Sequence, residues 1–159
     1  MSCSFRRTAM SAVIAIVMMN LAWQTQARAQ DPADKSVELL KTFVTEFVTI
    51  TPGEGKFPAS FQMGSKNEPN EQPVHEVTLK SKFAIAKYEV PQNLYQAVMG
   101  NNPSRWKGPR NSVELMSWED ANLFCKKITE ALRQQKLIAE DEVIRLPTEA
   151  EWEYCCRAG

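Results

Sequence analysis

The stretch that decides the fold is RLPTEAEWEYCCRAG, residues 145–159. Thr148 stands just before a helix-forming run, and Thr148 followed by Glu151 three positions later has the pattern of a capping box. Glu149, Glu151 and Glu153 fall in the first turns of the predicted helix, where carboxylates are stabilised by the positive end of the helix dipole. The helix start therefore explains these glutamates without a paired-carboxylate acid–base site.

Two more helices are predicted upstream. Ser117 with Asp120 forms a second capping box. Behind it an apolar stripe recurs at i, i+3, i+4, i+7 and i+11, made of Ala121, Phe124, Cys125, Ile128 and Leu132. A shorter helix is predicted over 91–99, with an apolar face of Leu94, Tyr95 and Val98 and Gly100 as its C-terminal stop. Three tryptophans near these helices are interpreted as core anchors rather than cleft residues: Trp106, Trp118 and Trp152.

The first half of the domain reads as short strands. Residues 47–50 are strand-like, residues 52–55 are a turn signal, and residues 61–64 read as a returning strand, so the pattern predicts a loose hairpin. Residues 65–73 lack periodicity and are expected to form a surface loop, followed by a strand-like stretch over 74–90. The only histidine, His75, lies in that stretch with no nucleophile elbow nearby. It is therefore interpreted as a structural or surface residue rather than a member of a Ser-His-acid triad.

The first 29 residues have the pattern of a secretory signal. Arg6 and Arg7 precede an almost wholly apolar run over 9–23, and Ala27-Arg28-Ala29 is a small-x-small cleavage motif, which predicts cleavage between Ala29 and Gln30. The apolar run is short for a membrane span, so an uncleaved anchor is the minor alternative. We expect an extracytoplasmic protein, periplasmic or secreted, without a transmembrane anchor after cleavage. Residues 30–46 are expected to be a linker or a short amphipathic helix.

Composition excludes some classes of protein. The 159 residues carry 19 basic and 19 acidic side chains, and residues 30–159 keep 16 basic and 19 acidic ones. Such a balance lacks the basic footprint of a nucleic-acid binder. The 43% hydrophobic content is that of a folding chain, and 130 residues suffice for one domain.

The cysteines give no catalytic pattern of their own. Cys3 leaves with the signal, and an odd set of three remains: Cys125, Cys155 and Cys156. In an oxidising compartment an odd count implies a free thiol, an intermolecular bridge or a partner elsewhere, and each cysteine can also be a small buried hydrophobe. The sequence shows no zinc-type cluster, no phosphate-binding glycine loop and no calcium loop.

Residues 145–159 strongly resemble the signature of the formylglycine-generating enzyme family, the sulfatase-modifying factors. The signature positions are structural ones: Arg145, Pro147, Thr148, Glu149, Glu151 and Trp152. Supporting blocks occur in the expected order at 61–64, 73–79, 87–90, 95–100, 102–104, 113–114 and 117–121. The resemblance covers residues 47–159, as the N-terminal part of the family's domain.

The resemblance implies an irregular α+β fold of the C-type-lectin-like type, here truncated. Enzymes of the family use oxygen and copper to oxidise a sulfatase cysteine to formylglycine, so a sulfatase or another exported protein is the implied partner. The copper-binding cysteines and the main calcium-binding segments lie in the C-terminal half of that domain, and Cys155 and Cys156 are not that pair. Copper and calcium are thus implied for a full-length member and no cofactor for this chain, which we expect to be inactive. In some members the cysteines matching Cys125 and Cys156 form disulfides with that half.

The sequence departs from the family pattern at two places, and two other functions are considered beside the family's own. Pro91 stands where the family usually has Thr, and residues 54–60 form a longer turn than is common, which weakens inferences about the substrate. A non-catalytic binding or scaffolding module of the cell envelope is the main alternative. The related sulfoxide synthase of ergothioneine biosynthesis is disfavoured, because its iron needs several histidines and this chain has one. We also expect exposed apolar surface and poor stability of the chain alone.

Overall fold

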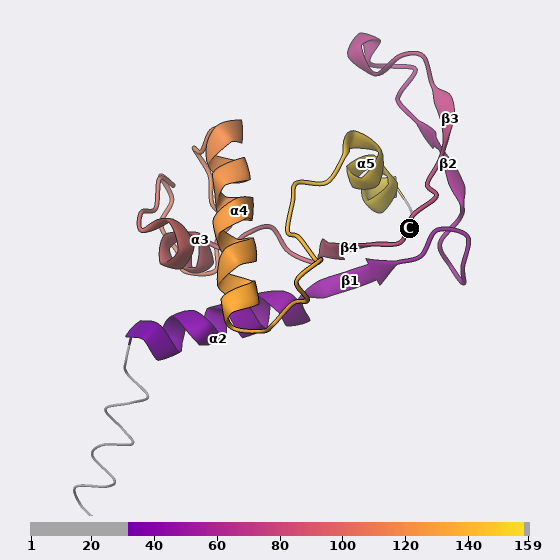
Figure 1. Ribbon diagram of the computed structural model, residues 1–159. Helices are drawn as coiled ribbons and strands as arrows, with labels where there is room; N and C mark the ends of the chain where they lie inside the picture. Colours follow the sequence, from indigo (N-terminus) through magenta and orange to yellow (C-terminus); the bar gives the residue numbers. More distant parts are fainter. Residues whose placement is uncertain (1–31, 158–159) are drawn as a thin grey trace, which may run out of the picture. The chain divides into compact units, whose positions relative to one another are not determined.

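The computed structural model describes residues 32–157 (Figure 1). The elements follow one another as helix α2 (Pro32–Thr45), strand β1 (Phe47–Ile50), strand β2 (Ser60–Met63), 3-10 helix η1 (Pro69–Glu71), strand β3 (His75–Thr78), strand β4 (Phe83–Ala86), and helices α3 (Gln92–Met99), α4 (Trp118–Gln134) and α5 (Glu149–Arg157). From Leu39 onward the chain forms one compact unit. Mixed helices and small antiparallel sheets make this an α+β fold.

Strand pairing differs from the hairpin expected from the sequence. β1 pairs with β4, with Phe47 opposite Ala86 and Ile50 opposite Phe83, while β2 pairs with β3 in a separate two-stranded sheet. The expected hairpin between 47–50 and 61–64 is therefore wrong. The connection over 51–59 closes its own turns, including a Gly53 N–H to Phe57 carbonyl bond of 2.8 Å, and it directs the two strands to different partners.

The strand-like stretch over 74–90 is two strands belonging to the two different sheets. β3 ends at Thr78 and β4 begins at Phe83, and no ladder joins them. The alternation of side chains is real within β3, since Val77 is more buried than Glu76 and Thr78. Periodicity alone does not reveal that the chain changes sheets between the two pieces.

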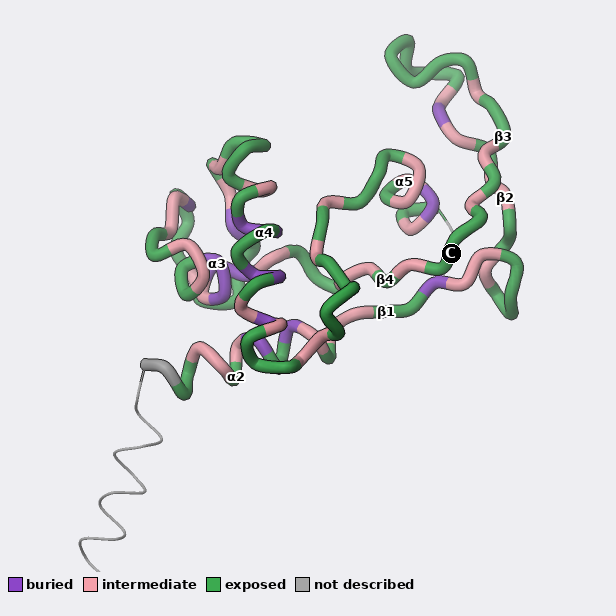
Figure 2. Tube along the Cα trace, viewed as in Figure 1, coloured by how far each residue is buried: buried purple, intermediate pink, exposed green. Residues whose placement is uncertain are grey.

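The main core lies between the C-terminal part of α2, the β1–β4 pair, α3 and α4 (Figure 2). Its buried members are Leu40, Phe43, Leu94, Tyr95, Val113, Phe124, Cys125, Ile128 and Leu132. The predicted stripe on α4 is confirmed, because Ile128 and Leu132 are fully buried. A side chain of this size stabilises the fold by about 1.5–3 kcal/mol when it is fully buried.

The segment before β1 is helix α2 over residues 32–45. Leu40, on this helix, is buried. Phe43 is 4% exposed and packs edge-on against Phe47 with ring centroids 4.9 Å apart. The C-terminal part of this helix therefore belongs to the packed domain rather than serving as a tether.

A second packing group joins α5 to the β2–β3 sheet. Tyr154 is fully buried, its ring meets Phe61 edge-on with centroids 5.4 Å apart, and its hydroxyl donates to the carbonyl of Pro58 at 2.8 Å. Near the same strand, the N–H of Gly64 donates to Oε1 of Glu153 at 2.7 Å. The signature helix is therefore fixed to the sheet by both apolar and polar contacts.

The predicted helix ends are confirmed. α3 stops at Gly100, whose φ of 85° is left-handed, and α4 begins with the Ser117–Asp120 capping box. The core assignment of the tryptophans is wrong, because Trp106, Trp118 and Trp152 are 67%, 70% and 59% exposed. Within residues 32–157, none of the helices has the length and apolar character needed to cross a bilayer.

Candidate functional site

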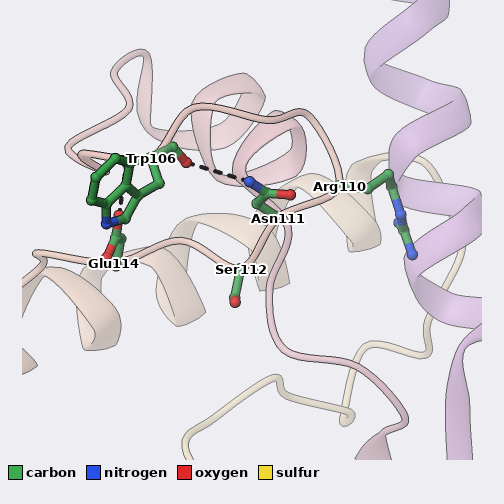
Figure 3. A pocket seen from close by; sticks show the side chains of 5 residues that line it. All are labelled: Trp106, Arg110, Asn111, Ser112 and Glu114. Carbon is green, nitrogen blue, oxygen red and sulfur yellow. Dashed lines mark hydrogen bonds between the residues drawn. The ribbon is translucent and has the colours of Figure 1, made fainter.

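The site is a shallow pocket of about 450 Å³ beside the loop that follows α3 (Figure 3). We call it the Trp106 pocket, and its lining residues are Trp106, Arg110, Asn111, Ser112 and Glu114. Figure 3 shows Trp106 and Glu114 at one side, Arg110 at the other, and Asn111 and Ser112 between them. It combines one large aromatic surface with side chains that can donate or accept hydrogen bonds.

Gln92, at the start of α3, organises the loop behind the pocket. Its side chain is 2% exposed, and its amide nitrogen donates to the carbonyls of Trp106 at 2.8 Å and Ser112 at 3.1 Å. Its amide oxygen accepts from the side chain of Asn102 at 3.0 Å and from the N–H of Gly108 at 3.1 Å. With donors and acceptor both used, this buried amide is satisfied and holds the loop in one conformation.

Glu114 holds the loop from its other side. Its Oε1 accepts from the N–H groups of Arg105 at 3.1 Å and Trp106 at 2.9 Å. The N–H of Glu114 in turn donates to the hydroxyl of Ser104, a buried residue, at 3.0 Å. Hydrogen bonds from Gln92 and Glu114 therefore hold the main chain at Trp106, while the Trp106 ring is exposed to solvent.

Arg110 closes the far side of the pocket. Its guanidinium pairs with Glu46 at 2.7 Å and lies 5.9 Å from the centroid of the Tyr88 ring. The Glu46 side chain is 17% exposed and that of Arg110 is 49% exposed. The pair therefore positions the guanidinium at the edge of the pocket.

Sequence reasoning identifies none of these residues as a site, although it singles out Trp106. The strings 102–104 and 113–114 stand out in the sequence only as family blocks. Asn102 has a local signal, because its side chain accepts from the N–H of Ser104 at 3.1 Å, an arrangement that Asn favours in turns. The buried amide of Gln92 has no such signal, since its partners lie ten to twenty residues away.

The signature residues form a structural cluster at the start of α5. Arg145 donates two hydrogen bonds to Glu151, of 2.7 and 2.6 Å. Glu151 also accepts from the N–H of Thr148 at 2.8 Å, and Thr148 accepts in return from the N–H of Glu151 at 3.2 Å, which confirms the capping box. The hydrogen bonds from Arg145 lower the pKa of Glu151 to about 2. Of the remaining signature residues, Pro147, Glu149 and Trp152 are exposed.

The three thiols of the described chain do not converge. Cys125 is buried in the α4 core, whereas Cys155 is half-buried and Cys156 exposed on α5. Neighbouring residues of a helix point about 100° apart, so Cys155 and Cys156 do not present their sulfurs to one point. Burial raises the pKa of Cys125 and of Cys155, which disfavours the thiolate that binds metals.

The described residues do not fit the metals that the family resemblance implies. A copper ion held by a cysteine pair would need two thiolate sulfurs that point toward one another. The sulfurs of Cys125, Cys155 and Cys156 are not arranged in this way. Among residues 32–157 there is also no group of three or more His, Cys, Asp or Glu side chains that could hold a metal ion. His75 is exposed, and its ring lies 2.9 Å from the carbonyl of Pro73, as expected for a surface histidine.

The predicted cleavage position, Ala29 and Gln30, lies outside the described residues.

These observations define an α+β domain that presents a shallow aromatic and polar pocket on an ordered loop. The family model described as "Sulfatase-modifying factor enzyme 1-like domain" matches residues 33–159. The chain belongs to this family, which confirms the resemblance found in the sequence.

Two known proteins are similar to this chain. A curated protein of Paenibacillus barcinonensis called "Chaperone protein LppX" is 36% identical over 108 residues, covering 52% of this chain and 38% of that protein. The chain thus spans well under half the length of this relative. A solved structure, "Treponema denticola variable protein 1", is 27% identical with a TM-score of 0.49, covering 69% of this chain and 55% of the other.

Proposed function

We propose that this chain is an exported sulfatase-modifying-factor-like protein whose residues 32–157 provide a framework and a binding surface without oxidase chemistry. The observation that carries this proposal is the placement of the three thiols, one in the α4 core and two side by side on α5. The family resemblance implies a copper ion held by a cysteine pair, and these three thiols do not face one another.

Export is part of the proposal. It is supported by the arginine pair, the apolar run and the small-x-small motif within residues 1–29. The same proposal places the protein in the periplasm or outside the cell. The C-type-lectin-like type of fold is likewise proposed, and the two small sheets joined by long ordered loops support it.

The partners of the thiols are proposed in the same way. Cys156 is exposed, so a disulfide to a cysteine outside residues 32–157 needs no rearrangement of α5. Cys125 is 8% exposed, so a disulfide there requires a segment packed directly against α4. Copper and calcium belong, on this proposal, to parts of a family member other than the described residues, with a sulfatase as a candidate partner.

A second candidate function is a non-catalytic binding module of the cell envelope. It is favoured by the relative that is named as a chaperone, at 36% identity over 108 residues. The exposed tryptophans of this chain are of a residue type that is enriched at the energetic centres of protein interfaces, which also supports this candidate.

Two experiments on one sample test the two functions, and the first asks whether the chain has oxidase activity. The exported chain is purified, loaded with Cu(I) and incubated under oxygen with a sulfatase-derived peptide that contains the cysteine, and formylglycine is followed by mass spectrometry. A peptide with Ser in place of that Cys is the control. We expect no conversion, and conversion would contradict the proposal. The second candidate is tested with the same sample by suppression of light scattering from thermally unfolding citrate synthase.

A further inference from the structure

Trp106 has an unusual combination of a fixed main chain and an exposed ring. Its N–H donates to Glu114 at 2.9 Å and its carbonyl accepts from Gln92 at 2.8 Å, yet the residue is 67% exposed. The other two exposed tryptophans, Trp118 and Trp152, do not line this pocket. A large apolar ring on an anchored main chain beside a pocket offers a ligand a flat surface whose position in the loop is already set, which lowers the cost of ordering the loop on binding.

Several polar atoms of the Trp106 pocket have no hydrogen-bond partner within residues 32–157. They are the hydroxyl of Ser112, the amide oxygen of Asn111 and Oε2 of Glu114. Arg110 uses one terminal nitrogen for Glu46, and its other N–H groups remain available. The pocket therefore offers both donors and acceptors on side chains that surround one ring (Figure 3).

The main chain around the pocket is already engaged. The carbonyls of Pro109 and Asn111 accept from the N–H groups of Asn93 at 3.0 Å and Gln92 at 2.9 Å. The carbonyl of Ser112 accepts from the Gln92 side chain at 3.1 Å. An extended peptide is usually held by free main-chain groups at a strand edge, and these are not free. The pocket thus favours a ligand recognised by side chains.

Charge argues for a neutral ligand. The guanidinium of Arg110 is paired with Glu46 at 2.7 Å, and the carboxylate of Glu114 disfavours an anion beside it. A cation over the indole is disfavoured as well, because the guanidinium of Arg105 already lies 5.0 Å from the centroid of that ring.

We propose that the Trp106 pocket binds a ring of a neutral sugar. A pyranose has one face of C–H groups, which would pack on the indole face opposite Arg105, and a rim of hydroxyls that each donate and accept. The rim of hydroxyls matches the side chains of Ser112, Asn111 and Glu114. The inference stands on this pocket alone and does not depend on the proposed function.

The test is a titration of the full chain with neutral sugars. The probes are glucose, galactose, mannose, N-acetylglucosamine and the tetramers of glucose and N-acetylglucosamine, followed by tryptophan fluorescence and calorimetry. We expect weak binding of at least one probe, loss of that binding in Trp106→Ala, and about two- to tenfold weaker binding in Ser112→Ala, as for the loss of one hydrogen bond. Trp118→Ala and Trp152→Ala are matched controls that keep wild-type affinity.

Three results would overturn the inference. They are the absence of binding to every probe, loss of binding in Trp118→Ala or Trp152→Ala rather than in Trp106→Ala, and binding of a tetra-alanine peptide in place of the sugars. Circular dichroism of each variant shows whether it is folded. Ser112→Ala removes only an exposed hydroxyl, so it tests the pocket even if the tryptophan variant fails to fold.

Discussion

At the scale of single residues, Gly64 shows how the signature helix is fixed to the sheet. Its N–H donates to Glu153 at 2.7 Å and its carbonyl accepts from Arg157 at 2.8 Å, while Arg157 and Glu153 form an ion pair of 2.6 Å. Gly64 has a φ of +95°, and a Cβ at this position would run into the carbonyl oxygen of Glu71. The position therefore requires glycine for its conformation and for its space.

We predict that Gly64→Ala destabilises the fold strongly. Gly55→Ala is the matched control, because Gly55 also has a positive φ, of +58°, but a Cβ there would meet no other atom within 4 Å. The control is expected to lose about 1 kcal/mol of unfolding free energy from backbone strain, and Gly64→Ala about 3 kcal/mol or more because main chain must also move. Urea unfolding followed by circular dichroism measures both. Equal losses would show that the contact with Glu71 is relieved without cost.

Single residues also show which contacts could not be predicted from the sequence. The helix dipole accounts for Glu153 in the sequence, yet its carboxylate meets Gly64, which is 89 positions away in the chain. No local sequence pattern predicts a contact between residues so far apart in the chain. In the same way residue type places the tryptophans in the core, and the structure exposes them because burial depends on what packs nearby.

At the scale of elements, helix ends were predictable and strand partners were not. The capping boxes at Ser117 and Thr148 can be found because the bonded residues are three positions apart. The pairing of β1 with β4 joins residues more than thirty positions apart, and the alternation of side chains is the same whichever strand is the partner. The turn signal over 52–55 is real, but it redirects the chain instead of closing a hairpin.

The start of α5 gives a prediction for pH dependence. The pKa of Glu151 falls from 4.5 to about 2 because Arg145 and then the Thr148 N–H stabilise its carboxylate. A lowered pKa contributes stability that is present above about pH 4.5 and is lost as the pH falls toward 2. At about 1.4 kcal/mol per pKa unit the contribution is at most about 3.5 kcal/mol, and it is less because Arg145 is half exposed.

The measurement compares the unfolding free energy of the wild type and of Glu151→Gln from pH 7 to pH 2. We expect a difference of about 2 kcal/mol at pH 7 that shrinks between pH 4.5 and pH 2. Glu149→Gln is the control, because Glu149 lies in the same helical turn but has no hydrogen bond to Arg145. A difference that stays constant with pH would contradict the role given to the Arg145–Glu151 pair.

At the scale of the whole molecule, the α+β class and the family can be predicted from blocks of sequence that occur in the family's order. Which large side chains lie on the surface cannot be predicted in this way. The apolar stripe of α4 identifies one core wall correctly. The sequence could not show that large side chains remain outside that core: Val48, Tyr88, Trp106, Leu115, Trp118, Leu123, Val143 and Trp152. Exposure of this kind is a property of the assembled surface.

This exposure has a direct optical consequence for the chain that begins at Gln30, because its tryptophans are Trp106, Trp118 and Trp152. We expect its native fluorescence in dilute solution to resemble that of indole in water, to be quenched readily by acrylamide, and to shift little on unfolding, while circular dichroism reports a clear transition. Trp→Phe substitutions at each position in turn should lower the intensity without moving the spectrum. A blue-shifted native emission that persists on dilution would mean that these rings are covered. A blue shift that disappears on dilution would mean that copies of the chain cover one another, so that the exposed side chains belong to an interface.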